Sequence, residues 1–203
     1  MTGTVLVTGF EPFDGFEVNP SAEIAKSLDG EVVAAYDVIG HVLALDYRSL
    51  GETLERLVTE HRPDVVLACG QANRGAITLE RIAINAVSTT REDNTGYAPE
   101  RDLIIEHGPA AYFATIDVHR LAEVLRTDGI PAEVSYHAGT YGCNWVLYYL
   151  LHRAARDEQP ERVGFVHIPP LPSQAIQKRL ATLPTMGLAT SIQAIRLIIT
   201  HLD

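Results

Sequence analysis

Short runs of apolar residues, bounded by glycine, proline or charged residues, recur along the chain, and such runs are typical of strands buried in a sheet. Between them lie segments whose apolar residues recur at the spacing of an amphipathic helix. The predicted strands are residues 4–9, one or two strands within 31–44, then 64–70, 77–87, 132–136 and 163–168. The predicted helices are residues 20–28, 47–61, 118–128, a helix that follows Cys143, and 188–202. This alternation predicts an α/β fold: a three-layer α/β/α sandwich with a mixed, largely parallel sheet, formed by residues 1–203 as a single domain.

Cys143 stands where a strand-like run passes through glycines into an apolar helix. Residues 132–136 form the predicted strand, and Gly139 and Gly142 mark the turn that follows it. A thiol in the first turn of a helix faces unpaired backbone N–H groups and the positive end of the helix dipole, and both stabilise the nucleophilic thiolate. Cys143 is therefore a candidate nucleophile. The alternative is a buried cysteine that packs as a small apolar residue.

A nucleophilic cysteine needs a side chain that moves protons, and His167 is the candidate. His167 comes at the end of a predicted strand, just before Pro169. Reactive groups gather at the carboxyl ends of parallel strands, where the loops 10–19 and 69–74 are also expected. His167 could equally be a core histidine that is bonded to a backbone carbonyl. His137 is closer to Cys143 in sequence and stays a competitor.

Glu80 is the candidate for a third group that would orient the histidine ring. It enters an otherwise apolar segment, where an unpaired charge would be costly. A carboxylate that fixes the tautomer of a catalytic imidazole is a common companion of such pairs. The alternative is a surface ion pair with Arg74 or Arg81, and spacing alone leaves both interpretations open.

The bulk properties exclude several classes of protein. The formal net charge is −10 and no basic stripe occurs, which argues against binding to nucleic acid. No apolar run approaches the length of a membrane span and no signal-peptide pattern is seen, so we expect a cytoplasmic protein that does not bind membranes. The two cysteines form no disulfide framework. Closely spaced pairs of metal ligands do not occur, and we expect neither a metal nor a cofactor.

The loop after the first predicted strand carries Phe10, Phe13 and Phe16. It lacks the glycine spacing and the Lys-Ser/Thr ending of phosphate-binding loops. Three phenylalanines suit a flat, apolar ligand better than a phosphate, although they could also be ordinary core residues.

Several motifs occur in one order along nearly the whole chain. They are Gly9-Phe-Glu-Pro-Phe13 with Asn19-Pro-Ser21, Gly70-Gln71, Glu80-Arg-Ile-Ala-Ile-Asn85, Gly108-Pro-Ala-Ala-Tyr-Phe-Ala-Thr115, Ala138-Gly-Thr140 with Cys143-Asn144, and Val166-His-Ile-Pro-Pro-Leu-Pro172. Together they resemble the pyroglutamyl peptidase I family of cysteine peptidases, the pyrrolidone-carboxylate peptidases. Separate motifs in a shared order make this resemblance more specific than any single motif.

The resemblance implies a cofactor-free cysteine exopeptidase that removes an N-terminal pyroglutamyl residue from peptides through a thioester intermediate. It implies that Cys143 is the nucleophile, His167 the acid/base and Glu80 the orienting carboxylate. It thereby favours His167 over His137.

The resemblance also implies a pocket for the substrate ring and an assembly. Phe10 and Phe13 would sandwich the pyroglutamyl ring, and Gln71 would hydrogen-bond its lactam. The expected partners are peptides with an N-terminal pyroglutamate and further copies of the chain, as a dimer or tetramer. The apolar helix 188–202 could serve such a contact, or pack on its own sheet.

The chain departs from the family at two places. The family usually reads Asp-Ala-Arg-Ile-Pro-Asp-Asn where this chain reads Ser88-Thr-Thr-Arg-Glu-Asp-Asn94. Without a gap the family's arginine falls on Thr90, so its role could pass to Arg91 or be lost. The residue before the nucleophile, usually β-branched, is Gly142 here, and we expect Gly142 to leave the floor of the substrate pocket more open.

Two alternatives to a peptidase stay open. A nucleoside phosphorylase- or hydrolase-like enzyme would share the expected phosphorylase/hydrolase-like fold, but no residues for a phosphate or ribose site are recognised. A non-catalytic pyroglutamyl-binding protein would keep the aromatic pocket without the chemistry.

Overall fold

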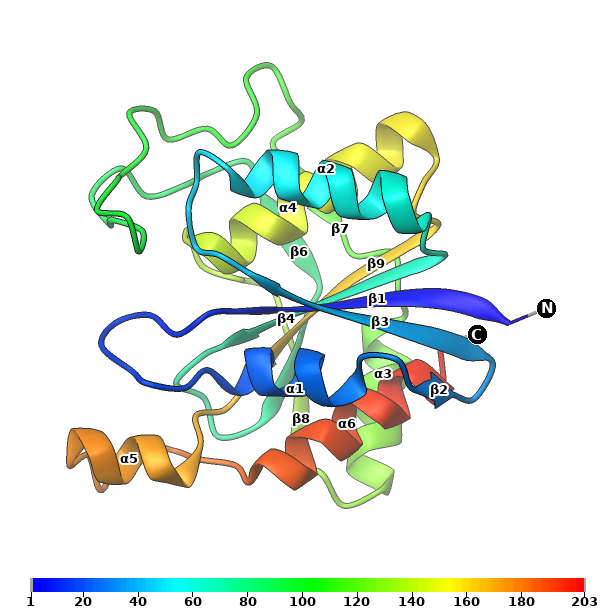
Figure 1. Cartoon of the computed structure of the whole chain (residues 1–203), viewed down its shortest axis with the longest axis vertical. Coiled ribbons are helices and arrows are strands. Elements are labelled where there is room, and N and C mark those ends of the chain that lie inside the picture. Colours follow the sequence, from blue (N-terminus) through cyan, green and yellow to red (C-terminus); the bar gives the residue numbers. More distant parts are fainter. Residues whose placement is uncertain (1, 203) are drawn as a thin grey trace.

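One seven-stranded sheet forms the centre of the molecule in the computed structural model, which describes residues 2–202 (Figure 1). The order of strands across it is β2 (Val32–Val33), β3 (Tyr36–Leu43), β1 (Gly3–Phe10), β4 (Val65–Gln71), β9 (Arg162–Ile168), β5 (Ile77–Glu80) and β8 (Ala132–Ser135). Strands β3, β1, β4 and β9 run parallel to one another. Strand β5 runs antiparallel to β9 and parallel to β8, and β2 runs antiparallel to β3. The predicted mixed, largely parallel sheet is confirmed.

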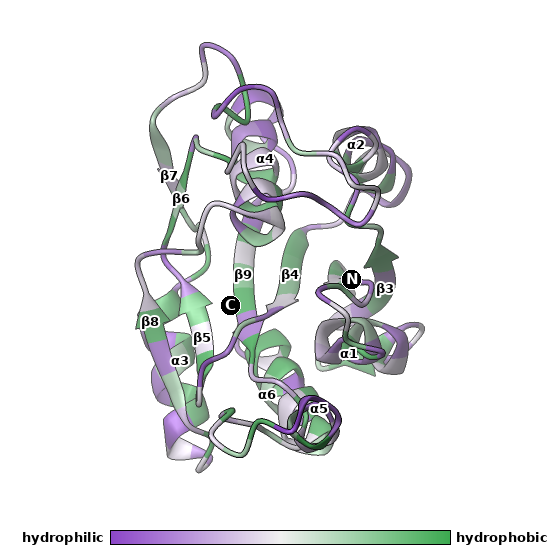
Figure 2. Cartoon of the chain, turned by 90° about the vertical axis from the view of Figure 1, so that its left-hand side faces the viewer, coloured by the Kyte–Doolittle hydropathy of each residue, from purple (hydrophilic) through white to green (hydrophobic). Residues whose placement is uncertain are grey.

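Helices cover both faces of this sheet (Figure 1). They are α1 (Pro20–Leu28), α2 (Leu50–His61), α3 (Val118–Thr127), α4 (Gly142–Asp157), α5 (Pro172–Lys178) and α6 (Leu188–Thr200). One buried apolar cluster joins the sheet to α1, α3 and α6, and a second joins the opposite face to α2 and α4. Figure 2 shows the hydrophobic strands β4 and β9 between these helix layers. The predicted three-layer α/β/α sandwich is therefore confirmed.

The start of α1 closes the loop that follows β1. The side chain of Asn19 accepts a hydrogen bond from the Ser21 N–H at 3.0 Å and so caps the helix, and Pro20 occupies the first turn. The Ser21 hydroxyl in turn accepts the N–H of Phe10 at 3.0 Å. Because both ends of the loop are bonded together, the residues between them are held against the carboxyl end of the sheet.

The predicted strand 77–87 is wrong as a single element. The chain leaves the large sheet at Arg81, and β6 (Ile82–Ile84) pairs with β7 (Ala111–Phe113) in a separate two-stranded sheet. Arg81 itself lies between the two sheets: its N–H donates to the carbonyl of Ser135 on β8, and its C=O accepts from the N–H of Ala114, the residue after β7. The apolar pattern continues across this break, because the second segment packs against the α4 side of the core. Periodicity therefore gives no sign of the change of sheet.

Three further elements differ from the sequence prediction. Helix α5 begins at Pro172 and was not among the predicted helices, although proline suits the first turn of a helix. Helix α2 begins at Leu50, because residues 47–49 form a turn before it. Strand β7 was not predicted, since three residues carry too little pattern.

The predicted domain limits, residues 1 and 203, lie outside the described residues, and the single-domain assignment stays a prediction. Within residues 2–202, no helix is long and apolar enough to cross a membrane.

Gly40 on β3 lets α1 approach the sheet backbone closely, so Gly40→Ala is expected to destabilise the fold. A Cβ there would lie 2.0 Å from the carbonyl oxygen of Ala25, so the helix would have to move. We expect the free energy of unfolding in urea to fall by about 1–3 kcal/mol, the scale of overpacking. Gly75→Ala is the matched control, because its Cβ would meet only Pro184 at 3.6 Å. Equal stability of the two variants would contradict this account of the α1 contact.

Candidate active site

Strand alternation turns the candidate site residues toward α4. Neighbouring residues of a strand point to opposite faces of the sheet. On β9, Val166 and Ile168 belong to the apolar cluster shared with α1, α3 and α6. His167 lies between them and therefore faces α4. On β5, Leu79 belongs to that same cluster, so Glu80 faces α4 as well.

Cys143 is the second residue of α4, in the first turn as predicted. The side chain of the N-cap residue Tyr141 makes no capping hydrogen bond, so within the described chain no side chain from the cap covers the first N–H groups. The next residue, Asn144, is 1% exposed and anchors this turn. Its side chain accepts from the Ile84 N–H at 3.0 Å and donates to the carbonyls of Ile84 and Ala86, each at 2.9 Å. The start of α4 is thereby fixed against the segment around β6.

Gly70 makes room for the sulfur of Cys143 on the face of the sheet. A Cβ at Gly70 would lie 2.7 Å from Cys143 Sγ and 2.9 Å from Phe165 Cζ, so only glycine accepts this approach. Gly70 is also the register partner of His167 in the parallel β4–β9 pair. The thiol therefore lies over bare backbone beside His167. Sequence reasoning overlooked this position, although a buried glycine in a strand often marks such a close approach.

Glu80 binds His167 and Arg74 through the same oxygen. His167 Nδ1 lies 2.7 Å and Arg74 Nη1 lies 2.8 Å from Glu80 Oε1. Glu80 is fully buried and His167 is 4% exposed. Both interpretations of Glu80 from the sequence therefore apply: it contacts the histidine, and it also forms an ion pair with Arg74. The pair with Arg74 is not a surface pair, because the Glu80 carboxylate is buried.

The charges of this cluster support one another. Burial alone would lower the pKa of His167, but its interactions with Cys143 and Glu80 outweigh burial and raise the pKa to about 9. Burial alone would raise the pKa of Glu80, but its hydrogen bond to His167 and the charge of that ring lower it below the usual value. At neutral pH the ring is therefore positively charged and the carboxylate negatively charged.

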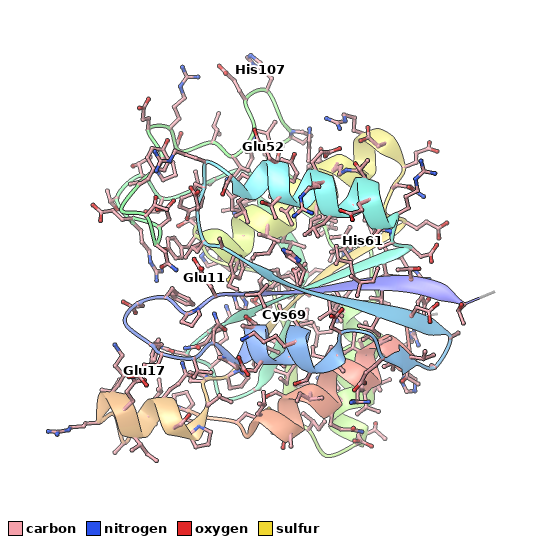
Figure 3. All side chains as sticks on the ribbon, viewed as in Figure 1. Glu11, Glu17, Glu52, His61, Cys69 and His107 are labelled. Atoms are coloured by element: carbon pink, nitrogen blue, oxygen red, sulfur yellow. The ribbon has the colours of Figure 1, made fainter. Side chains whose placement is uncertain are left out.

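The other histidine and the other cysteine lie in different surroundings. His137 is exposed at the rim of the same cavity, and its carbonyl accepts a hydrogen bond from Arg74 at 3.1 Å. Among residues 2–202, the ring of His137 has no hydrogen bond to Cys143. Cys69 lies on β4, fully buried in the cluster on the far face of the sheet (Figure 3). Burial raises the pKa of the Cys69 thiol far above its usual value.

A cavity of about 490 Å³ opens above Cys143 and His167, a volume that suits a small organic group. Phe13 and Gln71 line it, as the resemblance implied. Phe10 lies outside the lining and is 3% exposed, packed in the core beneath α2 and α4. The structure therefore brings one of the two predicted phenylalanines to the cavity.

Gly142 does not open the floor of the cavity as expected from the sequence. It lies outside the cavity lining, and a Cβ at this position would lie 2.6 Å from Leu45 Cδ1. Leu45, which is 2% exposed, fills the space that a β-branched residue would occupy. The expectation was wrong because the compensating side chain comes from a distant segment of the chain.

Arg91 also lines the cavity, although its loop departs from the family pattern. Its guanidinium carbon lies 3.8 Å from the centre of the Tyr141 ring, which is a cation–π contact. The Tyr141 hydroxyl donates to the carbonyl of Glu92 at 2.6 Å, so the loop and the start of α4 hold each other. Within the described residues, no group of three His, Cys, Asp or Glu side chains is arranged to hold a metal ion.

Iodoacetamide near neutral pH is expected to modify Cys143 well before Cys69. The first thiol faces the cavity beside a positively charged ring, whereas the second is buried in apolar surroundings that disfavour its thiolate. Peptide mass mapping of the alkylated protein measures the two yields. The Cys143→Ala variant is the control and should take up no label in the same time. Faster labelling of Cys69 would contradict the assignment of the reactive thiol.

Comparison with known proteins connects this geometry to a family. The family model described as pyroglutamyl peptidase matches residues 3–202. A pyrrolidone-carboxylate peptidase of Thermococcus onnurineus is 43% identical over 196 residues, which cover 96% of each chain. A second, of Thermococcus kodakarensis, is 45% identical and covers 92% of this chain and 89% of its own.

Solved structures agree with the sequence relatives. The pyrrolidone carboxyl peptidase of Thermococcus litoralis superposes with a TM-score of 0.94 at 39% identity, covering 98% of this chain and 92% of that one. A mutant of the Pyrococcus furiosus enzyme superposes with a TM-score of 0.93 at 39% identity, covering 97% of this chain and 96% of that one. A family match over nearly the whole chain, with relatives above 40% identity, shows that this chain belongs to the pyroglutamyl peptidase family.

Proposed function

We propose that the protein hydrolyses the peptide bond after an N-terminal pyroglutamyl residue, with Cys143, His167 and Glu80 as its catalytic triad. The observation that carries the proposal is the joint position of these residues: a helix-start thiol over Gly70, beside a charged histidine that is bonded to a buried carboxylate. The names of the relatives support the same substrate class.

In the first step the thiolate of Cys143 attacks the carbonyl carbon between the pyroglutamyl ring and the next residue. A carbon–sulfur bond forms and the carbonyl oxygen takes up negative charge. The N–H groups in the first turn of α4 are suited to stabilise this oxygen, because they lack partners within the helix and lie at the positive end of its dipole. No metal takes part in this scheme.

In the second step the tetrahedral intermediate collapses to a thioester. His167 gives a proton to the nitrogen of the leaving peptide as the carbon–nitrogen bond breaks. The neutral ring then accepts a proton from water, whose oxygen attacks the thioester. The carbon–sulfur bond breaks, the Cys143 thiolate and the protonated His167 are restored, and the pyroglutamic acid product loses its proton to solvent. Glu80 holds the ring in the tautomer that these transfers need. Arg74 donates to the same oxygen, and its positive charge helps to keep the carboxylate ionised.

Recognition of the ring involves aromatic and amide groups. The pyroglutamyl ring is neutral, flat and partly apolar, so the face of Phe13 and the amide of Gln71 suit it. Phe10 lies outside the cavity lining and has a different role: together with Leu45 it packs under the start of α4. A Cβ placed on Gly142 would lie 3.5 Å from two ring atoms of Phe10.

A fluorogenic pyroglutamyl amide, assayed with and without prior iodoacetamide, tests the proposal as a whole. We expect hydrolysis that alkylation abolishes. Binding of pyroglutamyl peptides without hydrolysis would instead indicate a non-catalytic binding protein, and phosphorolysis of nucleosides with no peptidase activity would indicate an enzyme of the alternative class.

Glu80→Gln is expected to lower turnover by up to about 10⁴-fold, the scale of other orienting carboxylates, and to change the pH profile. His167 donates a proton to the leaving amine, so kcat/KM of the wild type should fall as pH rises through about 9. Removing the carboxylate removes one influence that raises the pKa of His167, so this alkaline limb should move to lower pH. Stopped assays across the alkaline range measure the shift. An unchanged rate and profile would reduce Glu80 to an ion-pair partner of Arg74.

Phe13→Ala is expected to lower kcat/KM for pyroglutamyl substrates, because the pyroglutamyl ring loses its contact with an aromatic side chain. The fall should correspond to a loss of about 1–3 kcal/mol of transition-state stabilisation. Substrates with an ionised N-terminal glutamate should be rejected by wild type and variant alike, since their charges would enter the slot unpaired. Phe113→Ala is the control, because Phe113 is 60% exposed on β7. Wild-type kinetics in Phe13→Ala, or equal turnover of glutamyl peptides, would mean that the ring is recognised elsewhere.

A further inference from the structure

Gln71, at the end of β4, is hydrogen-bonded on the side away from the cavity by Gln174 of α5. Gln71 is 7% exposed and lines the cavity, whereas Gln174 is 2% exposed and lies outside the lining. Gln174 Nε2 lies 2.9 Å from Gln71 Oε1. A buried amide that bonds a cavity amide is a strong restraint, because each lost bond would leave a polar group unsatisfied.

The backbone determines which way the amide of Gln174 faces. Its Oε1 lies 2.7 Å from the backbone nitrogen of Leu171, and a backbone N–H can only donate. Its Nε2 therefore points the other way, where it donates to the carbonyl of Val18 at 3.1 Å and to Gln71 Oε1. If the amide were turned over, its N–H group would face the N–H of Leu171 and its oxygen would face the carbonyl oxygen of Val18. Gln174 is thus locked by two backbone groups from different parts of the chain.

The fixed orientation of Gln174 also fixes the orientation of the Gln71 amide. Its Oε1 accepts from Gln174, so its amide nitrogen is the polar atom left to face the cavity. Within the described chain, Gln71 Nε2 has no acceptor of its own. Without Gln174 the amide of Gln71 could turn over and present either a donor or an acceptor, since the two ends of an amide have nearly the same shape.

We propose that Gln174 is a positioning residue that makes Gln71 a dedicated hydrogen-bond donor, so that the cavity selects a ring with a carbonyl oxygen at this point. The inference rests on the proposed peptidase function and adds the origin of its ring selectivity. A pyroglutamyl ring offers its lactam oxygen to Gln71 Nε2. A prolyl ring has a methylene group at this point and a positively charged nitrogen beside it. An inverted Gln71 would present its oxygen and could accept a hydrogen bond from that nitrogen, whereas the fixed Gln71 presents only N–H groups and cannot.

Three variants test the proposal with matched pyroglutamyl and prolyl fluorogenic amides. Gln174→Met keeps the length of the side chain and removes both of its hydrogen-bonding groups. Gln177→Met makes the same change on the exposed face of α5 and is the control. Gln71→Glu keeps an oxygen for Gln174 Nε2 but presents a second carboxylate oxygen to the cavity, so it reverses the polarity without breaking the buried bond.

In Gln174→Met we expect KM for the pyroglutamyl amide to rise about 10-fold or more, the scale of one hydrogen bond left unmade, with kcat little changed. The preference for pyroglutamyl over prolyl amides should narrow by the same factor. In Gln71→Glu, KM for the pyroglutamyl amide should rise at least as much, while the thermal stability is retained. Gln177→Met should have the KM and the preference of the wild type.

An unchanged KM and preference in Gln174→Met would overturn the proposal, as would a loss that is equal for both amides and follows the fraction of folded protein. If Gln174→Met does not fold, Gln71→Glu decides: a wild-type KM for the pyroglutamyl amide would show that no donor is needed at this point. A wild type that fails to hydrolyse the pyroglutamyl amide would instead defeat the proposed function.

Discussion

The close approach of the first turn of α4 to the bare backbone of β4 at Gly70 is the constraint on which the site depends. Any side chain at Gly70 would collide with Cys143 Sγ, so the absence of one lets the helix start over the sheet. This approach brings the N–H groups in the first turn of α4, the proposed oxyanion site, close to the thiol. It also puts the thiol beside His167, because Gly70 and His167 are register partners in neighbouring parallel strands. A single contact between backbone and sulfur thus aligns the proposed nucleophile, the proposed acid/base and the proposed oxyanion site.

The sheet that builds the core also separates its two thiols and buries the charges of the site. Alternation along β4 sends Cys69 to one face, where burial keeps its thiol protonated, while the Cys143 helix packs on the other. Glu80 is fully buried, and an unpaired carboxylate there would cost several kcal/mol. Two donors, from His167 and Arg74, meet it at one oxygen. Breaking such a buried pair costs about 3–5 kcal/mol, so the carboxylate proposed to orient the histidine also stabilises the fold.

Much of the layered fold was predictable from the sequence, because apolar periodicity and helix caps act locally. The strand that ends at His167 and the N-cap at Asn19 are examples. The change of sheet at Arg81 was not predictable, since the same apolar pattern serves both sheets. The filling of the Gly142 space by Leu45, and the lock of Gln71 by Gln174, depend on side chains that meet only in the folded chain. For the site, motif order suggested the three candidate catalytic residues, whereas spacing alone left His137 and the Arg74 pair as open alternatives.

The central claim is that Cys143 carries the pyroglutamyl group as a thioester during turnover, and trapping that intermediate tests it most directly. The enzyme would be mixed with a pyroglutamyl amide, quenched in acid within one turnover and mapped by peptide mass spectrometry. We expect the peptide that contains Cys143 to gain the mass of one pyroglutamyl group, and the gain to be absent in Cys143→Ala. A pyroglutamyl group on any other residue, or undiminished hydrolysis by Cys143→Ala, would contradict the account.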